Sequence, residues 1–128
     1  TSSVSQMAAL AAYEGDQQCV EDFRKTFQRR RDLIVNLAKG IPGLEVNIPQ
    51  GAFYLFPKCS SFFGKSNGKY TINNSTDFAM YLLEEGHVAT VGGDDFGSLD
   101  CFRMSYATSD DNIKEALQRI KDALSKLK

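Results

Sequence analysis

One arginine of this sequence stands among apolar and small residues, in the stretch Phe102–Ala107, which reads Phe-Arg-Met-Ser-Tyr-Ala. The alternation predicts a strand in which Arg103 and Ser105 point away from the face that carries the large apolar side chains. A guanidinium is a planar fork that binds a carboxylate through two parallel hydrogen bonds, which a lysine cannot reproduce. Two interpretations stay open: Arg103 lies on a solvated sheet face, with or without an acidic partner, or it receives the carboxylate of a ligand.

Other residues that could carry chemistry give weaker patterns. The glycines of Gly92–Gly97 lack the Lys-Ser/Thr of a phosphate-binding loop and do not open a helix. His87, the only histidine, has no partner nearby in the sequence that would make it an acid or base. The basic run Arg29–Arg31 is diluted by neighbouring acidic residues and predicts a solvated helix face, not an anion-binding patch.

The three cysteines, Cys19, Cys59 and Cys101, lie about 40 residues apart. No pair has the spacing of a metal site or of a redox motif. We therefore expect reduced thiols, no metal and a cytoplasmic protein, because a disulfide framework belongs to oxidising compartments.

The overall composition excludes several classes of partner. The sequence has 128 residues, enough for one domain, and a formal net charge of −1. A nearly neutral chain offers no field that would attract nucleic acid or an acidic membrane surface. No apolar run reaches the length of a membrane span, and no signal peptide is visible. The sequence begins at Thr1, which suggests processing or excision from a longer protein.

Apolar spacing and capping residues predict four helices. Three of them cover residues 5–14, 17–38 and about 75–85, and each ends at a glycine. The helix 17–38 carries one apolar face, formed by Val20, Phe23, Phe27, Ile34 and Leu37. The last helix follows Thr108, which with Asp111 matches a capping box. Its apolar stripe recurs every three or four residues and consists of Ile113, Leu117, Ile120, Leu124 and Leu127.

Four segments predict strands, namely residues 44–48, 52–56, 88–91 and 101–106, and residues 58–74 read as a loop. The segment 52–56 is continuously apolar, which is typical of a buried strand. We therefore expect an α+β fold in which helices pack on one face of a small, mostly antiparallel sheet, preceded by a long helix.

Several motifs taken together resemble one family. Ile48–Tyr54 reads Ile-Pro-Gln-Gly-Ala-Phe-Tyr, Phe96-Gly97 precedes the stretch that holds Arg103, and a capped acidic helix follows it. These motifs resemble the carboxyl-terminal small domain of class I/II aminotransferases of fold type I, which depend on pyridoxal phosphate, and of the aspartate aminotransferase type in particular. The resemblance implies that Arg103 binds the α-carboxylate of the substrate. Gly92 stands where the family usually has proline, so we expect a looser loop.

The resemblance also implies how the chain is organised. Residues 1–15 would be a helix left over from the large domain, and residues 16–128 the small domain with its connecting helix 17–38. The parent enzyme would be a homodimer that transfers amino groups between aspartate, or a similar amino acid, and a 2-oxo acid. The small domain would supply the mobile wall of the active site that closes on the substrate.

No lysine of this sequence lies in the complete motif that surrounds the family's Schiff-base lysine, which binds the cofactor. Ser66–Lys69 matches only Ser-x-x-Lys and lacks the glycines and arginine that follow in the family. We therefore expect no catalytic or cofactor-binding residue in this chain, and no activity of the chain alone. A non-catalytic module that binds a small carboxylate, or that mediates oligomerisation through its last helix, stays open as the alternative.

Overall fold

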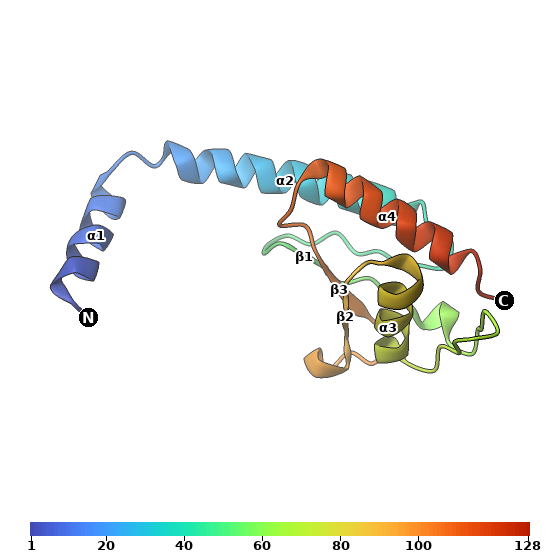
Figure 1. Cartoon of the computed structure of the whole chain (residues 1–128). Helices are drawn as coiled ribbons and strands as arrows, with labels where there is room; N and C mark the ends of the chain where they lie inside the picture. The colour runs from blue at the N-terminus through green and yellow to red at the C-terminus, as the bar shows by residue number, and fades with distance from the viewer.

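Four α-helices and a short sheet make up the fold, which the computed structural model describes from residue 1 to residue 128 (Figure 1). All four predicted helices are present, and they are α1 (Ser3–Glu14), α2 (Gln18–Lys39), α3 (Ser75–Gly86) and α4 (Asp110–Leu124). The first three begin and end within two residues of the predicted bounds, because capping residues and glycines mark their ends in the sequence.

The cap of α4 differs from the prediction by one residue. The hydroxyl of Ser109, not that of Thr108, accepts the backbone N–H of Asn112 at 3.2 Å. The Thr108 hydroxyl instead accepts a hydrogen bond from the Asn112 side chain at 2.9 Å. The capping-box prediction was therefore wrong in its register, and Ser109 supplies the acceptor because it holds the extended conformation that precedes a helix.

The three strands are antiparallel, with β3 (Phe102–Ser105) between β1 (Tyr54–Leu55) and β2 (Val91–Gly92). Helices α2 and α3 contact the sheet, and α4 packs against both of them. Figure 1 shows α4 alongside the second half of α2, with α3 next to the strands. The predicted α+β class, with helices on one face of a small antiparallel sheet, is confirmed.

A core of 20 buried residues lies between this sheet face and the helices. The whole predicted stripe of α4, from Ile113 to Leu127, belongs to it. These side chains are consequently not free to mediate oligomerisation, and that part of the alternative interpretation is wrong.

The strands are shorter than the sequence predicts. In the segment 44–48 only Glu45 pairs, forming a single bridge with Lys58. The segment 52–56 pairs only from Tyr54 onward, because Ala52 has a positive φ of 56° that interrupts extended backbone. It is also half-buried and not fully buried, since Leu55 lies in the core and its neighbours are partly exposed. The strand predicted at 88–91 begins only at Val91.

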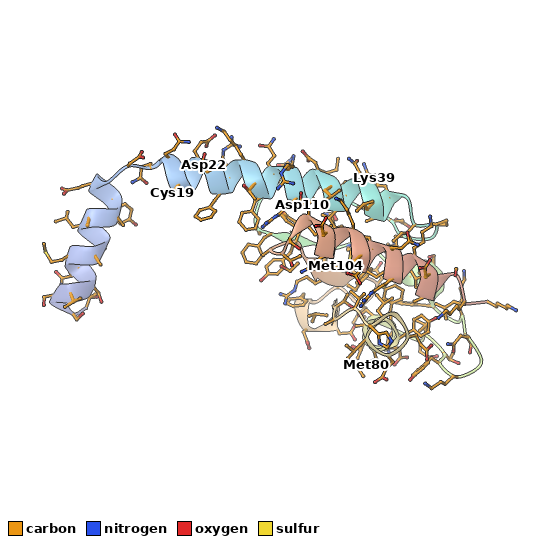
Figure 2. The ribbon with its side chains drawn as sticks, turned by 45° about the horizontal axis from the view of Figure 1, so that its top comes forward. Cys19, Asp22, Lys39, Met80, Met104 and Asp110 are labelled. Carbon is orange, nitrogen blue, oxygen red and sulfur yellow. The ribbon has the colours of Figure 1, made fainter.

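Helix α1 and the first half of α2 project beyond this core. No residue of α1 is buried, and Figure 2 shows Cys19 and Asp22 on the projecting part of α2, far from Lys39. The exposed apolar side chains of this segment are Val4, Met7, Leu10, Tyr13, Val20 and Phe23. The predicted apolar face of α2 is thus divided, with its second half in the core and its first half uncovered. None of the helices combines the length and the apolar character that crossing a membrane requires.

Candidate functional site

Arg103 lies in the central strand, on the sheet face opposite the helices. Its neighbours Phe102 and Met104 are buried, whereas Arg103 is partly exposed, so the predicted alternation is confirmed. The guanidinium carbon lies 4.5 Å from the centre of the Tyr54 ring and 4.4 Å from that of Phe96. A cation over an aromatic face is attracted by about 0.5–1 kcal/mol at an exposed site. Two rings therefore hold this guanidinium in place.

The other five arginines all form ion pairs with carboxylates. The pairs are Arg24 with Glu21, Arg29 and Arg30 with Asp110, Arg31 with Asp32, and Arg119 with Glu115. Arg103 has no such partner, so a pairing with an acidic neighbour of this chain is not part of its environment. Its N–H groups stay available, oriented by the rings, and can bind an anion from outside the chain.

The sheet register brings Tyr54 to this site. Tyr54 lies opposite Ser105, and Ser105 shares its face of β3 with Arg103. Tyr54 is therefore the diagonal neighbour of the arginine, at a distance that an aromatic side chain spans. The residue is 49 positions away in the sequence, and only the pairing of β1 with β3 makes the two adjacent.

Phe96 reaches the site from the loop after β2. It ends the short 3₁₀ helix η2 (Asp94–Phe96), and its ring meets that of Phe56 edge-on with 6.1 Å between the ring centres. Tyr54, Phe56 and Phe96 were not predicted as site residues. Tyr54 and Phe56 could have been predicted from the sequence, because they lie two positions apart in one strand. The alternation of a strand therefore places both on the face opposite the buried Leu55.

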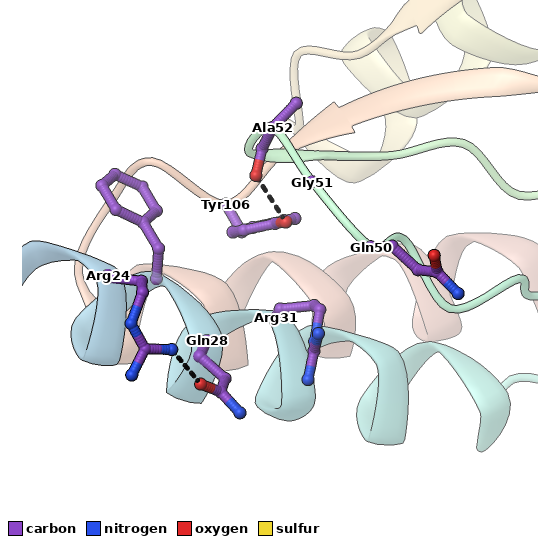
Figure 3. Close-up of a pocket in the computed structure, with 8 residues that line it drawn as sticks. Arg24, Gln28, Arg31, Gln50, Gly51, Ala52 and Tyr106 are labelled. Carbon is purple, nitrogen blue, oxygen red and sulfur yellow. Dashed lines mark hydrogen bonds between the residues drawn. The ribbon is translucent and has the colours of Figure 1, made fainter. Parts of the chain in front are cut away.

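A separate hollow of about 400 Å³ lies between α2 and the segment Gln50–Ala52 (Figure 3). Arg24 and Arg31 line it, but Arg24 is bound to Glu21 and to Gln28, and Arg31 is bound to its neighbour in the chain. The Tyr106 hydroxyl donates to the carbonyl of Ala52 at 2.9 Å and closes one wall. The arginines of this hollow are thus already neutralised, in contrast to Arg103.

The remaining candidates are not gathered around Arg103. His87 ends α3 in the left-handed conformation, and its carbonyl accepts a hydrogen bond from Arg119 at 3.4 Å. All three cysteines are free thiols. Burial, together with the nearby Cys101 and Asp100, raises the pKa of the Cys59 thiol to about 12, so it is not a nucleophile. No three side chains of the metal-ligating types lie together.

Comparison with known proteins decides the family. The family described as "Aminotransferase class I and II" matches residues 1–120 of the sequence. The chain belongs to the class I and II aminotransferases. The aspartate aminotransferase of Rhizobium meliloti strain 1021 is 48% identical over 128 aligned residues, which are 98% of this chain and 31% of that protein. A probable aspartate/prephenate aminotransferase of Rickettsia felis is 46% identical over 94% of this chain and 30% of its own length.

The same family appears among solved structures. The crystal structure of the aspartate aminotransferase from Rhizobium meliloti superposes on 99% of this chain with a TM-score of 0.94 and 46% identity, and the match covers 32% of that chain. An alanine aminotransferase from Pyrococcus furiosus matches 94% of this chain with a TM-score of 0.82 and 30% identity, and the match covers 29% of that chain. This aminotransferase chain spans about a third of the length of the relatives that it matches.

Proposed function

We propose that this chain is the carboxyl-terminal domain of an aminotransferase that transfers amino groups between aspartate, or a similar amino acid, and a 2-oxo acid. In this proposal Arg103 binds the α-carboxylate that both substrates share. The observation that carries it is the state of this one arginine, which two aromatic rings hold and no carboxylate of the chain neutralises. A planar cation fixed in this way is prepared for bidentate binding of a carboxylate.

The domain proposal concerns residues 1–15 and the connecting helix. Six large apolar side chains of α1 and of the first half of α2 are uncovered. Exposed apolar side chains that continue over two helices indicate an interaction surface. We propose that the preceding part of the full-length protein covers this surface as its large domain, that residues 16–128 form the small domain, and that the full-length protein is a homodimer. Three free thiols support the proposal of a cytoplasmic location.

Pyridoxal phosphate, which the family implies, does not fit Lys69, the lysine at which the sequence partly matches the family's motif. A lysine that forms a Schiff base needs an amine that loses its proton readily, and therefore a lowered pKa. At Lys69, hydrogen bonds with Tyr70 and Glu85 raise the pKa of the ammonium instead. Lys69 is also largely exposed on the surface, with its nitrogen 3.3 Å from the Glu85 carboxylate. We therefore assign the cofactor and its lysine to the preceding part of the protein.

The contribution of this chain to the reaction is binding and orientation. Arg103 would fix the α-carboxylate, and the aromatic rings beside it would form an apolar wall against the substrate. Closure of such a wall on the substrate excludes water and strengthens the ion pair. Because the α-carboxylate belongs to every amino acid, the contribution should not depend on the side chain of the substrate.

The full-length protein tests this proposal. We expect it to form oxaloacetate from aspartate when a 2-oxo acid is supplied, and we expect Arg103→Ala to reduce the rate strongly. Arg119→Ala is the matched control, since Arg119 is an exposed arginine paired with Glu115 outside the site. The proposal fails if the full-length protein transfers no amino group, or if the two variants behave alike. Binding of free carboxylates without any transfer would instead favour the non-catalytic module.

A further inference from the structure

Phe96 lies in a short loop, and its ring can stay on the guanidinium only if something fixes that loop. The 3₁₀ helix η2 that holds it has three residues, too few to be rigid alone. The hydrogen bonds of its first residue, Asp94, and of the preceding Gly93 connect this loop to the start of α3.

The Asp94 carboxylate uses both of its oxygens. The Ser75 hydroxyl donates to Oδ1 at 2.8 Å, and the Thr76 hydroxyl donates to Oδ2 at 2.7 Å. Ser75 and Thr76 form the first turn of α3, where the helix dipole favours a negative charge. The two hydroxyl groups also lower the pKa of Asp94, so the carboxylate stays ionised at neutral pH. Asp94 is therefore fixed to the helix and forms no ion pair with Arg103.

Ser75 makes a second contact to the same loop. Its oxygen accepts the backbone N–H of Gly93 at 2.9 Å, and it is the only polar residue in the buried set. Gly93 also exchanges backbone hydrogen bonds within the loop, since its N–H donates to the Cys101 carbonyl at 2.9 Å and its carbonyl accepts the N–H of Ser98 at 3.0 Å. No side chain fits at this position, because a Cβ there would lie 2.1 Å from the Ser98 carbonyl oxygen and 2.4 Å from that of Cys101. Hydrogen bonds to α3 and contacts within its own backbone thus both hold the loop. They offset the conformational freedom that is expected from Gly92.

We propose that Ser75, Thr76 and Asp94 are positioning residues of the carboxylate site, because they hold the Phe96 ring against Arg103. The inference rests on the proposed function of Arg103 and extends it to residues of α3 that contact no substrate. Loss of the contacts should let the loop and its ring move away, so that the guanidinium loses its fixed plane. Substrate binding should then weaken, while the chemical step at the cofactor proceeds as before.

Steady-state kinetics of the full-length holoenzyme with aspartate and with alanine test the inference. We expect Asp94→Asn and Thr76→Val each to raise KM about three- to tenfold for both amino acids, while kcat stays within about twofold. This change is smaller than the full effect of losing a hydrogen bond to a charged group, because these residues act on the substrate only through the Phe96 ring. Asp95→Asn is the matched control, since Asp95 is exposed, adjacent and forms no hydrogen bond, and it should change neither parameter. If Asp94→Asn does not fold, Thr76→Val still tests the inference, because Thr76 is exposed and valine has nearly the same shape as threonine.

A double-mutant cycle shows whether Asp94 acts through Phe96. We expect Phe96→Leu to raise KM, and Asp94→Asn added to it to change KM by less than about twofold, because the ring that it positions is gone. The inference is overturned if Asp94→Asn has no larger effect on KM than Asp95→Asn, or if Asp94→Asn lowers kcat without raising KM. It is also overturned if the KM of the double variant rises by the full product of the two single effects of Asp94→Asn and Phe96→Leu. If Arg103→Lys leaves KM and kcat/KM unchanged, the proposed function itself fails, and this outcome is distinct from the others.

Discussion

Replacing Arg103 with lysine in the full-length protein keeps the positive charge and removes the planar fork. A lysine ammonium is a point charge and cannot bind both carboxylate oxygens with parallel hydrogen bonds. Losing one charge-assisted hydrogen bond costs about 1.5–3 kcal/mol. The weaker contact with the rings, which lie at 4.5 and 4.4 Å, adds about 0.5–1 kcal/mol. The total is about 2–4 kcal/mol, a loss of about 30- to 700-fold in kcat/KM.

The assay compares substrates that differ in their side chains. The kcat/KM for a monocarboxylic amino acid such as alanine and for the dicarboxylic aspartate should fall by similar factors, because both present the same α-carboxylate. Arg119→Lys, at an arginine paired with Glu115, should change neither value by more than about twofold. A loss confined to aspartate would show that Arg103 binds the side-chain carboxylate, and a loss below threefold for both would show that Arg103 binds neither carboxylate of the substrate.

Three further predictions concern the fold. Tyr106→Phe removes the hydroxyl that donates to the Ala52 carbonyl at 2.9 Å and should lower the free energy of unfolding in urea by about 1 kcal/mol; an unchanged midpoint would contradict this. Asp110→Asn removes the partner of two α2 arginines and should cost about 1 kcal/mol, less in high salt, by the same measurement. Mass spectrometry of thiols alkylated at pH 8 should find the exposed Cys19 modified before Cys59, whose pKa of about 12 keeps it protonated; the reverse order would contradict the burial of Cys59.

The sequence was sufficient where local signals decide the structure. The N-cap of α3 is such a case: the side chain of Asn74 accepts from the N–H of Asp77 at 2.7 Å, and the helix begins where the sequence indicates. The alternation around Arg103 likewise predicted which side chains are buried. The one-residue error at Ser109 arose because two neighbouring residues, Thr108 and Ser109, both carry hydroxyl groups, and the pattern does not distinguish them.

The carboxylate site itself depends on contacts that no local pattern contains. Tyr54 and Phe96 meet Arg103 only through the pairing of three strands and the path of a loop. The positive φ of Ala52, which shortens β1, could not be predicted either, because the apolar run around it favours extended backbone. At Val20 and Phe23 a local pattern is present but does not predict burial. Their spacing predicts a buried helix face, and the rest of this chain does not cover it.

A crystal structure of the full-length protein with a bound 2-oxo acid tests the role of Arg103 most directly. We expect two nitrogens of the Arg103 guanidinium at about 2.7–2.9 Å from the two oxygens of the carboxylate next to the oxo group. The rings of Tyr54 and Phe96 should still lie against the guanidinium, as they do in this chain. A carboxylate held elsewhere, for example by Arg31 in the hollow beside α2, with Arg103 left without a ligand, would show that Arg103 does not bind the substrate.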